Sequence, residues 1–517
     1  MNRILKITIA LMLVLIPEMG ILIVIMNAPI NFNEYVYIAA SVLYSRYRLY
    51  KDFGFLQMPV LPMIYGTFFK LSGTSHYLFF GRLFNLLFLN ISVLFVYLLA
   101  FRYTKNFIAS LSLALLLVCN DMIISVMSES SNYVMPMAFS LAGYYLFIVG
   151  SFNSRDRRSV MLLSGVLSSL AAGAKLFYAF LVPVFLIVSL IYPRSIKIRE
   201  RLSKKTLPLL LGLVIGSAPS FYYLISSYHS FIFYNLDYRF LYARLAKSAN
   251  YSLVMSWPEK LNLARSLLSP ITISDAGALA LITAIFFAIK LAGGGYLRFR
   301  KLKMFPGEFL LIIMILSVSI VTIFLPSTMW RQYFAMPVPF VIILLACCLE
   351  GKVNINRSWP GITVSIIIFL AFSANIPDYL QMCPRSRWLR NWEVTRVHND
   401  ALKIRDSIKH IDRKPKIATL YTIYPLEADM EIYKEFACGV FLYQVGDYIP
   451  EKDRKYLVYA SPGNLFSLLA KDPPDAILVG FNYNDEPFAR FANANGYRQI
   501  TLGPGAETIY VPGNNSQ

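Results

Sequence analysis

Two carboxylates in the first polar stretch of the chain, Glu34 and Asp52, are of a type that could do chemistry. They follow an apolar run of roughly 20 residues, so they lie where the chain leaves that run. A carboxylate that is partly shielded from water can accept a proton from an attacking hydroxyl group. It can also bind a divalent cation that neutralises a phosphate leaving group. A solvated loop carboxylate or a helix cap is the alternative, and spacing alone leaves both interpretations open.

Two basic residues in apolar or aromatic surroundings could bind an anion. Lys175 interrupts a long apolar stretch, in Gly-Ala-Lys-Leu-Phe-Tyr, and Arg331 lies in Trp-Arg-Gln-Tyr-Phe. An ionisable group at membrane depth is costly and usually has a partner, so Lys175 could bind a lipid phosphate; a lysine that reaches up to the interface is the alternative. Arg331 offers several donors to phosphate oxygens, and a positive charge in an aromatic belt is its alternative.

The elements that must position these residues are membrane-spanning helices. The 517 residues are 57% hydrophobic with a mean hydropathy of +0.54, and the apolar residues come in long runs. Such runs indicate a bilayer as the solvent, in which spanning segments must be helical to satisfy their own backbone. We expect about eleven spans of roughly 20 residues each. They are 7–26, 77–100, 107–120, 133–150, 160–175, 176–193, 207–226, 271–292, 307–325, 333–350 and 358–375.

The distribution of charge orients these spans. The net charge is +20, yet from Asp378 to the end the basic and acidic residues balance at 17 each. The excess lies in short loops between apolar runs, which is the positive-inside pattern and not a stripe for nucleic acid. Dividing 160–193 at Lys175 puts every basic loop on one side. The N-terminus is then cytoplasmic, and the carboxylates, Lys175 and the C-terminus lie outside.

The chain divides into a membrane part and a soluble part. Residues 1–376 form the bundle, with an outer loop at 27–75 whose helical segments, 33–47 and 59–71, lie along the membrane surface. Residues 377–517 have a soluble composition. Their alternation of strands and helices predicts a small extracytoplasmic α/β domain. The expected strands are 416–421, 455–460, 476–481 and 508–511. The predicted fold class is a mainly α polytopic bundle with this domain attached.

The outer loop resembles the first external loop of the GT-C superfamily, membrane glycosyltransferases that use polyprenyl-phosphate sugars. It is most similar to the branch of protein O-mannosyltransferases and the lipid A aminoarabinose transferase. That branch carries an Asp-Glu-like motif, a Gly-x-x-x-Tyr-x-Asp stretch and a Pro-rich entry into the next helix. The corresponding residues are Asn33-Glu34-Tyr35, Leu49-Tyr50-Lys51-Asp52-Phe53 and Gln57-Met58-Pro59-Val60-Leu61-Pro62. Asn33 stands where the family often has Asp, which moves the expected base to Glu34, with Asp52 second.

The resemblance implies roles for further residues. Glu129 or Asp121 would be the second acidic group of the superfamily, on the substrate side; Asp121 could equally be a helix cap. Lys175 and Arg331, with Tyr333 beside it, would bind the lipid phosphate. A divalent cation, Mg²⁺ or Mn²⁺, serves some relatives and not others; if one is needed here, Glu34 and Asp52 are its expected ligands.

The activity implied is transfer of a sugar from a polyprenyl-phosphate donor to a glycan, lipid or protein acceptor, with inversion. It would take place on the outer face of a bacterial inner membrane, with the C-terminal domain in the periplasm. The chain shows no nucleotide-binding loop, which favours a lipid-carried donor. Membrane lipids are the other expected partners, and nucleic acid is not one. A lipid-linked glycan polymerase or ligase is one alternative. A transporter or flippase is another, although it would need polar residues along a path through the membrane.

Overall fold

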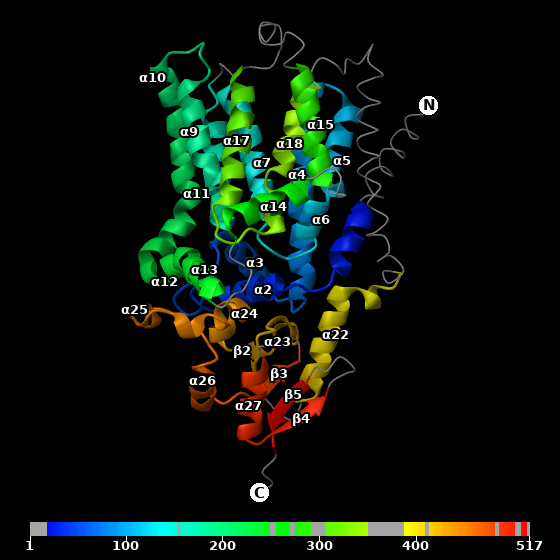
Figure 1. Ribbon diagram of the computed structural model, residues 1–517, viewed down its shortest axis with the longest axis vertical. Helices are drawn as coiled ribbons and strands as arrows, with labels where there is room; N and C mark the ends of the chain where they lie inside the picture. The colour runs from blue at the N-terminus through cyan, green and yellow to red at the C-terminus, as the bar shows by residue number, and fades with distance from the viewer. Residues whose placement is uncertain are drawn as a thin grey trace.

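The computed structural model has a helical bundle at one end and a smaller α/β domain at the other (Figure 1). The residues it describes are 18–152, 156–248, 255–268, 275–290, 306–349, 387–408, 413–480, 485–501 and 508–513. The predicted span 358–375 and most of 7–26 lie outside them.

The bundle is built from helices of different lengths. Those of 16 residues or more are α4 (Tyr77–Thr104), α7 (Val134–Ser151), α8 (Arg158–Ala174), α11 (Leu207–Ser226), α15 (Asp275–Lys290) and α17 (Pro306–Phe324). The shorter ones are α2 (Phe32–Tyr44), α3 (Val60–Ser72), α5 (Phe107–Cys119), α6 (Asp121–Met127), α9 (Leu181–Ile191), α10 (Ile198–Arg201), α12 (Tyr228–Ile232), α13 (Tyr238–Ser248), α14 (Trp257–Leu268) and α18 (Val338–Cys348).

The described helices support an integral membrane protein with fewer countable spans than predicted. Five helical segments of the described chain are long and apolar enough to cross a membrane, or up to seven if two bent pairs each count as one span. Shorter apolar helices at Arg158–Ala174, Leu176–Ile191 and Gly277–Ala288 correspond to three more predicted spans. The described residues therefore do not establish the number eleven.

The predicted division at Lys175 is confirmed. Helix α8 ends there, Lys175 has an extended backbone (φ −148°, ψ 115°), and a 3-10 turn, η1 (Leu176–Phe180), leads into α9. On the other side α8 packs closely against α11. A Cβ on Gly165 or Gly212 would collide with the backbone of the partner helix, so these small residues permit the close approach.

The two ends of the bundle differ in charge. Glu427 of the C-terminal domain accepts a hydrogen bond from Leu78 N–H, in the first turn of α4. Arg102 and Lys105 lie at the other end of this 28-residue helix, about 40 Å away at 1.5 Å per residue. The basic segment around α10 is also at the end far from the domain (Figure 1). Among the described residues, the basic end of α4 and the segment around α10 therefore lie opposite the domain, in agreement with the charge pattern.

The C-terminal domain is built on a five-stranded mixed sheet in the order β2-β1-β3-β5-β4. Its strands are β1 (Lys416–Ala418), β2 (Glu431–Ile432), β3 (Ala476–Val479), β4 (Tyr497–Thr501) and β5 (Thr508–Pro512). Strands β2, β1 and β3 are parallel, and β5 is antiparallel to both β3 and β4. The expected strand at 455–460 is wrong, because these residues form a turn and an irregular segment outside the sheet.

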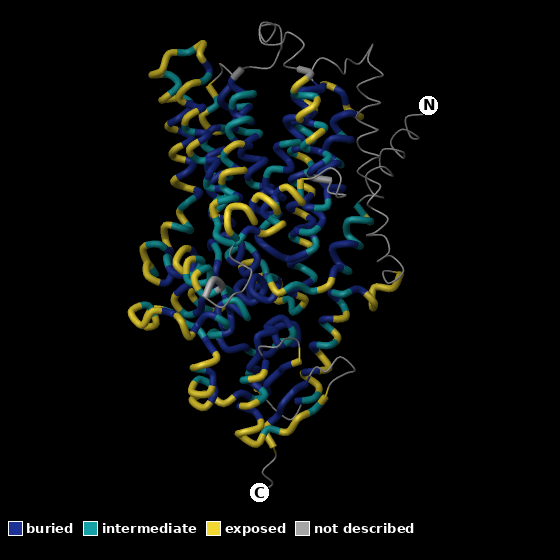
Figure 2. The backbone as a smooth tube through the Cα atoms, viewed as in Figure 1, coloured by how far each residue is buried: buried dark blue, intermediate teal, exposed yellow. Residues whose placement is uncertain are grey.

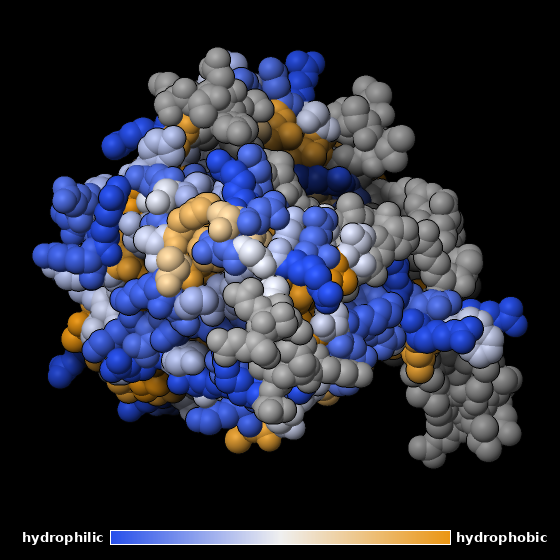
Figure 3. All heavy atoms as spheres, turned by 90° about the horizontal axis from the view of Figure 1, so that it is seen from below, coloured by the Kyte–Doolittle hydropathy of each residue, from blue (hydrophilic) through white to orange (hydrophobic). Residues whose placement is uncertain are grey.

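Helices also cover this sheet, and its central strands β3 and β5 are almost wholly buried. They are α22 (Glu393–Asp406), α23 (Ile423–Glu427), α24 (Gly439–Tyr443), α25 (Glu451–Arg454), α26 (Leu465–Lys471) and α27 (Glu486–Ala494). Seen from the end away from the bundle, the described surface is mostly hydrophilic (Figure 3).

Helices α2 and α3 form the layer between the bundle and the domain, close to the predicted segments 33–47 and 59–71. The chain turns by 91° between the helix Glu18–Asn27 and α2. The layer is largely buried (Figure 2). The Thr422 hydroxyl donates to the Tyr35 carbonyl at 2.8 Å, and the Tyr238 hydroxyl to the Phe441 carbonyl at 3.0 Å. Polar bonds thus fix the domain onto α2 and α13.

Candidate active site

Glu34 is part of the helix cap that starts α2. The Asn31 side chain accepts from Asn33 N–H at 3.0 Å, and Glu34 at the third helical position accepts from Asn31 N–H at 3.1 Å. This reciprocal arrangement is a capping box, which satisfies backbone donors that the first helical turn leaves free. Glu34 therefore has a structural task that is independent of any chemistry.

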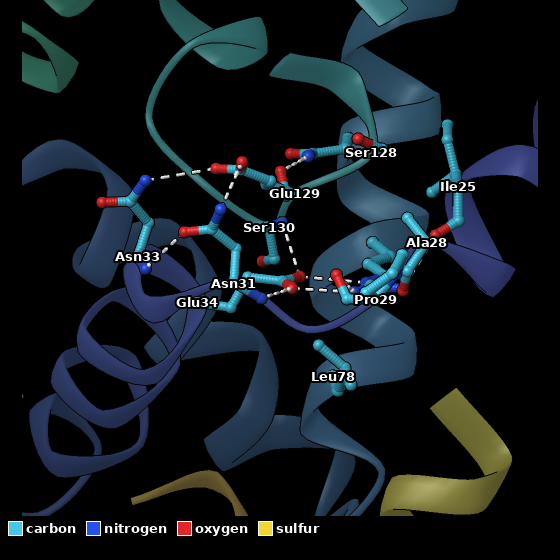
Figure 4. Close-up of polar contacts among 12 residues, drawn as sticks. Ile25, Ala28, Pro29, Asn31, Asn33, Glu34, Leu78, Ser128, Glu129 and Ser130 are labelled. Atoms are coloured by element: carbon cyan, nitrogen blue, oxygen red, sulfur yellow. Dashed lines mark hydrogen bonds and ion pairs between the residues drawn. The ribbon is translucent and has the colours of Figure 1, made fainter. Parts of the chain in front are cut away.

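A buried arginine neutralises the same carboxylate. Arg82 of α4 donates from Nε to Glu34 Oε1 at 2.9 Å and from Nη2 to Oε2 at 2.7 Å, and both side chains are 0% exposed. Arg82 also donates to the carbonyls of Ile25 and Ala28, and Ser130 N–H donates to Glu34 at 2.8 Å. Figure 4 shows Glu34 inside this cluster. With four donors and no exposure, the predicted base is not presented to an acceptor hydroxyl.

Glu129 is the second carboxylate of the cluster, and its surroundings are different. It is 9% exposed and is held by two amides: Asn31 Nδ2 at 2.8 Å and Asn33 Nδ2 at 3.2 Å. Both amides point toward it in Figure 4. Burial, opposed by the Asn33 bond and reinforced by the charge of Glu34, raises the pKa of Glu129 to about 7. A carboxylate with this pKa can exchange a proton near neutral pH.

The loop that carries Glu129 is fastened to α4. The Asn85 side chain donates to the carbonyls of Met127 and Glu129. A Cβ on Gly81 would collide with the Ser130 side chain, so glycine lets the helix and the loop meet. Within the described chain, the buried hydroxyls of Ser130 and Ser131 have no hydrogen-bond partner. Unpaired buried polar groups are costly, so these hydroxyls are candidates to contact a polar ligand.

Lys175 lies in the next outer turn and faces a pocket. Its Nζ donates to Asn132 Oδ1 at 3.2 Å and lies 3.2 Å from the centroid of the Tyr133 ring. The pocket is small, with room for about one water molecule. Aromatic and sulfur-containing side chains dominate the lining, which consists of Tyr133, Met137, Lys175, Phe177, Tyr178, Gln332, Tyr333, Ala335 and Met336. A cation at an apolar, aromatic wall is suited to a ligand with a charged head and an apolar chain.

A second cation, Arg239, joins Lys175. It lies on α13, donates to Gln57 Oε1 at 3.3 Å and stands over the Phe177 ring at 5.8 Å. Arg239 and Glu129 are the charged groups that act on Lys175. Among the described residues, neither Lys175 nor Arg239 has a carboxylate within 4 Å. The arrangement therefore leaves positive charge to be neutralised by something else, and an anionic group such as a phosphate fits it.

Arg331 and Asp121, both predicted to bind substrate, are brought together as a pair. Arg331 Nη2 lies 2.6 Å from Asp121 Oδ2, with the arginine side chain 51% exposed. This pair neutralises the guanidinium that was expected to hold a phosphate. Tyr333, two residues on, lines the pocket beside Lys175. Three residues that were predicted to bind substrate therefore lie in one region: Lys175, Tyr333 and Glu129. Arg331 lies at the edge of this region.

Asp52 lies apart from the cluster and has its own partner. Arg48, four residues earlier, donates to it from Nε at 3.1 Å, from Nη2 at 3.0 Å and from its backbone N–H at 2.9 Å. The Arg48 side-chain bond holds the pKa of Asp52 below its usual value. One arginine thus engages Asp52 and another engages Glu34, and the expectation that these two carboxylates bind a divalent cation stays a prediction. The described group with metal-binding types and spacing is elsewhere, at His76, His398 and Glu427.

Sequence reasoning missed Arg82 as the partner of Glu34 and gave Arg239 only as a weaker candidate than Lys175 and Arg331. Arg82 had a signal: it stands in the apolar span at 77–100, and a charge there needs a partner. The spacing of Asn31 and Glu34 was also readable as a helix cap. Arg239 had no comparable signal, because only the fold brings α13 to the turn at Lys175.

No protein-family model and no curated protein matches the chain. Solved structures do match. ArnT from Cupriavidus metallidurans, bound to undecaprenyl phosphate, aligns with a TM-score of 0.61 at 12% identity, over 98% of this chain and 99% of that one. Arabinofuranosyltransferase AftD from Mycobacteria aligns with a TM-score of 0.52 at 12% identity, over 96% of this chain and 41% of that one. The chain therefore shares its fold with these solved structures.

Proposed function

We propose that this protein is a membrane glycosyltransferase that takes a sugar from a polyprenyl-phosphate donor and passes it to an acceptor hydroxyl. The observation that carries the proposal is the convergence of Lys175 and Arg239 on an aromatic pocket beside Glu129; neither cation has a carboxylate partner in the part of the chain that the structure describes. The structural neighbours support it, since one is bound to undecaprenyl phosphate and the other is an arabinofuranosyltransferase.

The donor phosphate would bind between the two cations. Lys175 supplies an ammonium donor and Arg239 a guanidinium, which is suited to several phosphate oxygens. Phe177, Tyr178 and Tyr333 would pack against the first isoprenoid units. As the sugar leaves, negative charge grows on the departing phosphate, and fixed donors stabilise that charge more than they stabilise the ground state. In this proposal Lys175 and Arg239 therefore stabilise the leaving group.

Glu129 is the proposed base. The acceptor O–H would donate its proton to the Glu129 carboxylate while the oxygen attacks the anomeric carbon of the sugar. The bond from that carbon to the phosphate oxygen breaks, and its electron pair leaves with the polyprenyl phosphate. Attack opposite to the leaving group inverts the anomeric centre. Asn31 and Asn33 would orient the carboxylate, and the Ser130 and Ser131 hydroxyls are placed to contact sugar or acceptor.

Glu34 becomes a positioning residue in this proposal. Its bonds to Arg82 and Ser130 N–H fix the loop that carries Glu129. Its negative charge also helps to raise the pKa of Glu129. The prediction that Glu34 or Asp52 is the base has not been tested, and a direct comparison of variants decides it. Roles for Asp121 and Arg331 in substrate binding likewise stay predictions.

The side of the membrane and the acceptor are further parts of the proposal. The basic end of the bundle would be cytoplasmic, so the site and the C-terminal domain would face the periplasm of a bacterial inner membrane. A glycan, lipid or protein hydroxyl fits the chemistry of the site. A lipid-linked glycan polymerase or ligase would use the same donor chemistry and differs only in its acceptor. A flippase would bind the same lipid without consuming the sugar.

Binding of undecaprenyl phosphate to the purified protein tests the phosphate site. We expect K175M and R239M each to weaken binding about 10- to 100-fold, because each removes a charge-assisted contact to phosphate. The alcohol undecaprenol should bind wild type weakly. K51M, which changes an exposed lysine of the outer loop, is the matched control. Equal binding by wild type, K175M and R239M would contradict the proposed phosphate site.

Mass analysis of membrane lipids and glycans separates transfer from transport. Cells that express the wild-type chain should gain a glycosylated product and free polyprenyl phosphate, and cells that express E129Q should gain neither. Translocated but unconsumed sugar lipid in both strains would favour the flippase.

A further inference from the structure

Two histidines and a glutamate meet where the C-terminal domain contacts the bundle, away from the site described above. His76 precedes α4, His398 lies on α22, and Glu427 ends α23. One potential ligand atom from each residue lies within 4.8 Å of the others. Three elements that are far apart in sequence thus bring two nitrogen ligands and one oxygen ligand together.

The contacts within this triad are already close. His398 Nδ1 lies 2.7 Å from Glu427 Oε2, and the rings of His76 and His398 have their centroids 3.8 Å apart at 33°. Glu427 is 1% exposed on its side chain, whereas His398 is partly buried and His76 is exposed. A buried carboxylate therefore forms the floor of the triad, and an ion could enter from the side of His76.

The floor is held in place by α4. Glu427 Oε1 accepts Leu78 N–H at 2.7 Å, so it caps a helix whose own N-cap residue, His76, makes no side-chain cap bond. This leaves Oε2 as the oxygen that faces the imidazoles. A carboxylate with one oxygen fixed and the other directed at two histidines is arranged as a metal ligand supported by its surroundings.

We propose that His76, His398 and Glu427 bind a zinc-type divalent ion that joins the C-terminal domain to the bundle. Two imidazole nitrogens and one carboxylate oxygen are the donor set of a three-ligand zinc site, with water in the fourth position. The ion would replace the direct bond between His398 and Glu427. Imidazoles also favour zinc, copper and nickel over Mg²⁺, so the site is distinct from the Mg²⁺ or Mn²⁺ chemistry expected of the outer carboxylates.

The ion would act on the helix that organises the active site. Along α4, Leu78 contacts Glu427, Arg82 binds Glu34, and Asn85 holds the carbonyl of Glu129. These positions recur every three or four residues, so they share one face of the helix. An ion at the start of α4 would therefore stabilise the face that holds the Glu129 loop, without taking part in the transfer itself.

Zinc titration of the full-length, untagged protein in detergent tests the proposal. After chelator treatment, we expect about one Zn²⁺ per chain by mass spectrometry, bound more tightly than about 1 µM in competition with a zinc indicator. Mg²⁺ should not compete. H76A and H398Q should each weaken zinc binding at least about 100-fold. Glutamine at 398 can still donate to Glu427, so the H398Q variant separates metal binding from a simple hydrogen bond.

H229A is the matched control among the four histidines of the chain. His229 also links a bundle helix to the C-terminal domain, by stacking on Tyr456 at 4.1 Å. H229A should bind zinc like wild type. His76 is exposed, so H76A should fold normally even if H398Q does not.

Hydrogen exchange locates the bound ion. Zinc should slow exchange in peptides that cover residues 76–82 and 393–408, in wild type and H229A only. Binding that is unchanged in H76A and H398Q, no saturable binding to wild type, or protection elsewhere in the chain would overturn the proposal. None of these outcomes bears on whether undecaprenyl phosphate binds, so the two proposals fail separately.

Discussion

Two groups of charged side chains lie side by side at the end of the bundle that contacts the C-terminal domain, and they differ in how completely the protein itself supplies their partners. Glu34 and Arg82 are fully buried, and every charged atom of the glutamate has donors from the protein. Glu129, Lys175 and Arg239 are held by amides and aromatic rings, and no described ion pair within 4 Å joins them. The first arrangement is complete without a ligand. The second group has charges that a bound ligand could neutralise. This difference is the reason for proposing that the first group is structural and that the second binds substrate.

The largest expected effect is on transfer by E129Q. Glutamine keeps the shape and can accept from one of the two asparagine amides, Asn31 or Asn33, but it cannot take a proton. General-base catalysis typically contributes a factor of 10² to 10⁴, so we expect transfer to fall by about that much. Binding of undecaprenyl phosphate to the variant should stay within about threefold of wild type, a change of less than about 1 kcal/mol. If E129Q kept full transfer activity, the hydrogen-bond and ion-pair partners of a carboxylate would not indicate whether it acts as the base.

The second expected effect is on the stability of E34Q. Removing one partner of a buried ion pair costs about 3–5 kcal/mol, because the remaining charge is left uncompensated. The unfolding free energy in detergent should fall by that order. The double variant E34Q/R82M should lose less than the sum of the two single variants, since it removes both charges. Additive losses would mean that the two side chains do not act as a pair.

E129Q should change stability in the opposite direction. The pKa of Glu129 is raised to about 7, so the folded state binds its proton more tightly than the unfolded state does. That stabilisation is fully present below pH of about 4, the unfolded pKa, and is lost as the pH rises through about 7. At pH 8 the variant should therefore be more stable than wild type by about 1–3 kcal/mol, with little difference at pH 5. A destabilised E129Q at pH 8 would place Glu129 among the fully partnered charges.

The smallest expected effect belongs to D52N. The pair of Asp52 with Arg48 is partly exposed, and such pairs contribute about 0–1 kcal/mol. Unfolding free energies of wild type and D52N should agree within that range. A transfer defect as large as that of E129Q would restore Asp52 as the predicted base and move the active site toward Arg48.

The sequence was sufficient for the architecture wherever a pattern is local. The break at Lys175, the surface helices of the outer loop and three of the five strands follow from apolar runs and turn residues. Strand β2 has only two residues and β4 is the largely exposed Tyr-Arg-Gln-Ile-Thr, so neither has a clear hydrophobic alternation. Segment 455–460 has the apolar composition of a strand, but it packs against α12 and η3 (Phe233–Asp237), where Tyr234 holds the Val458 backbone.

The sequence predicted the location of the candidate site better than it predicted the role of each residue in it. An outer carboxylate after the first span and a lysine in an apolar run are visible in one dimension. Which carboxylate is neutralised depends on Arg82, some 48 residues away, and which cation is free depends on Asp121, about 210 residues from Arg331. Contacts between residues this far apart in sequence decide whether a carboxylate is available as a base or is held in a structural ion pair. No local sequence pattern predicts such contacts.

The pH dependence of transfer by the wild-type protein tests the central claim most directly. If Glu129 is the base, the rate at saturating donor and acceptor should rise with pH as the carboxylate loses its proton, with a midpoint near 7. E34Q, assayed per folded molecule, should keep much of this activity with its midpoint shifted downward, because the charge of Glu34 helps to raise the pKa of Glu129. A rate that is flat between pH 5.5 and 8.5, or a midpoint that is the same in both proteins, would contradict the account.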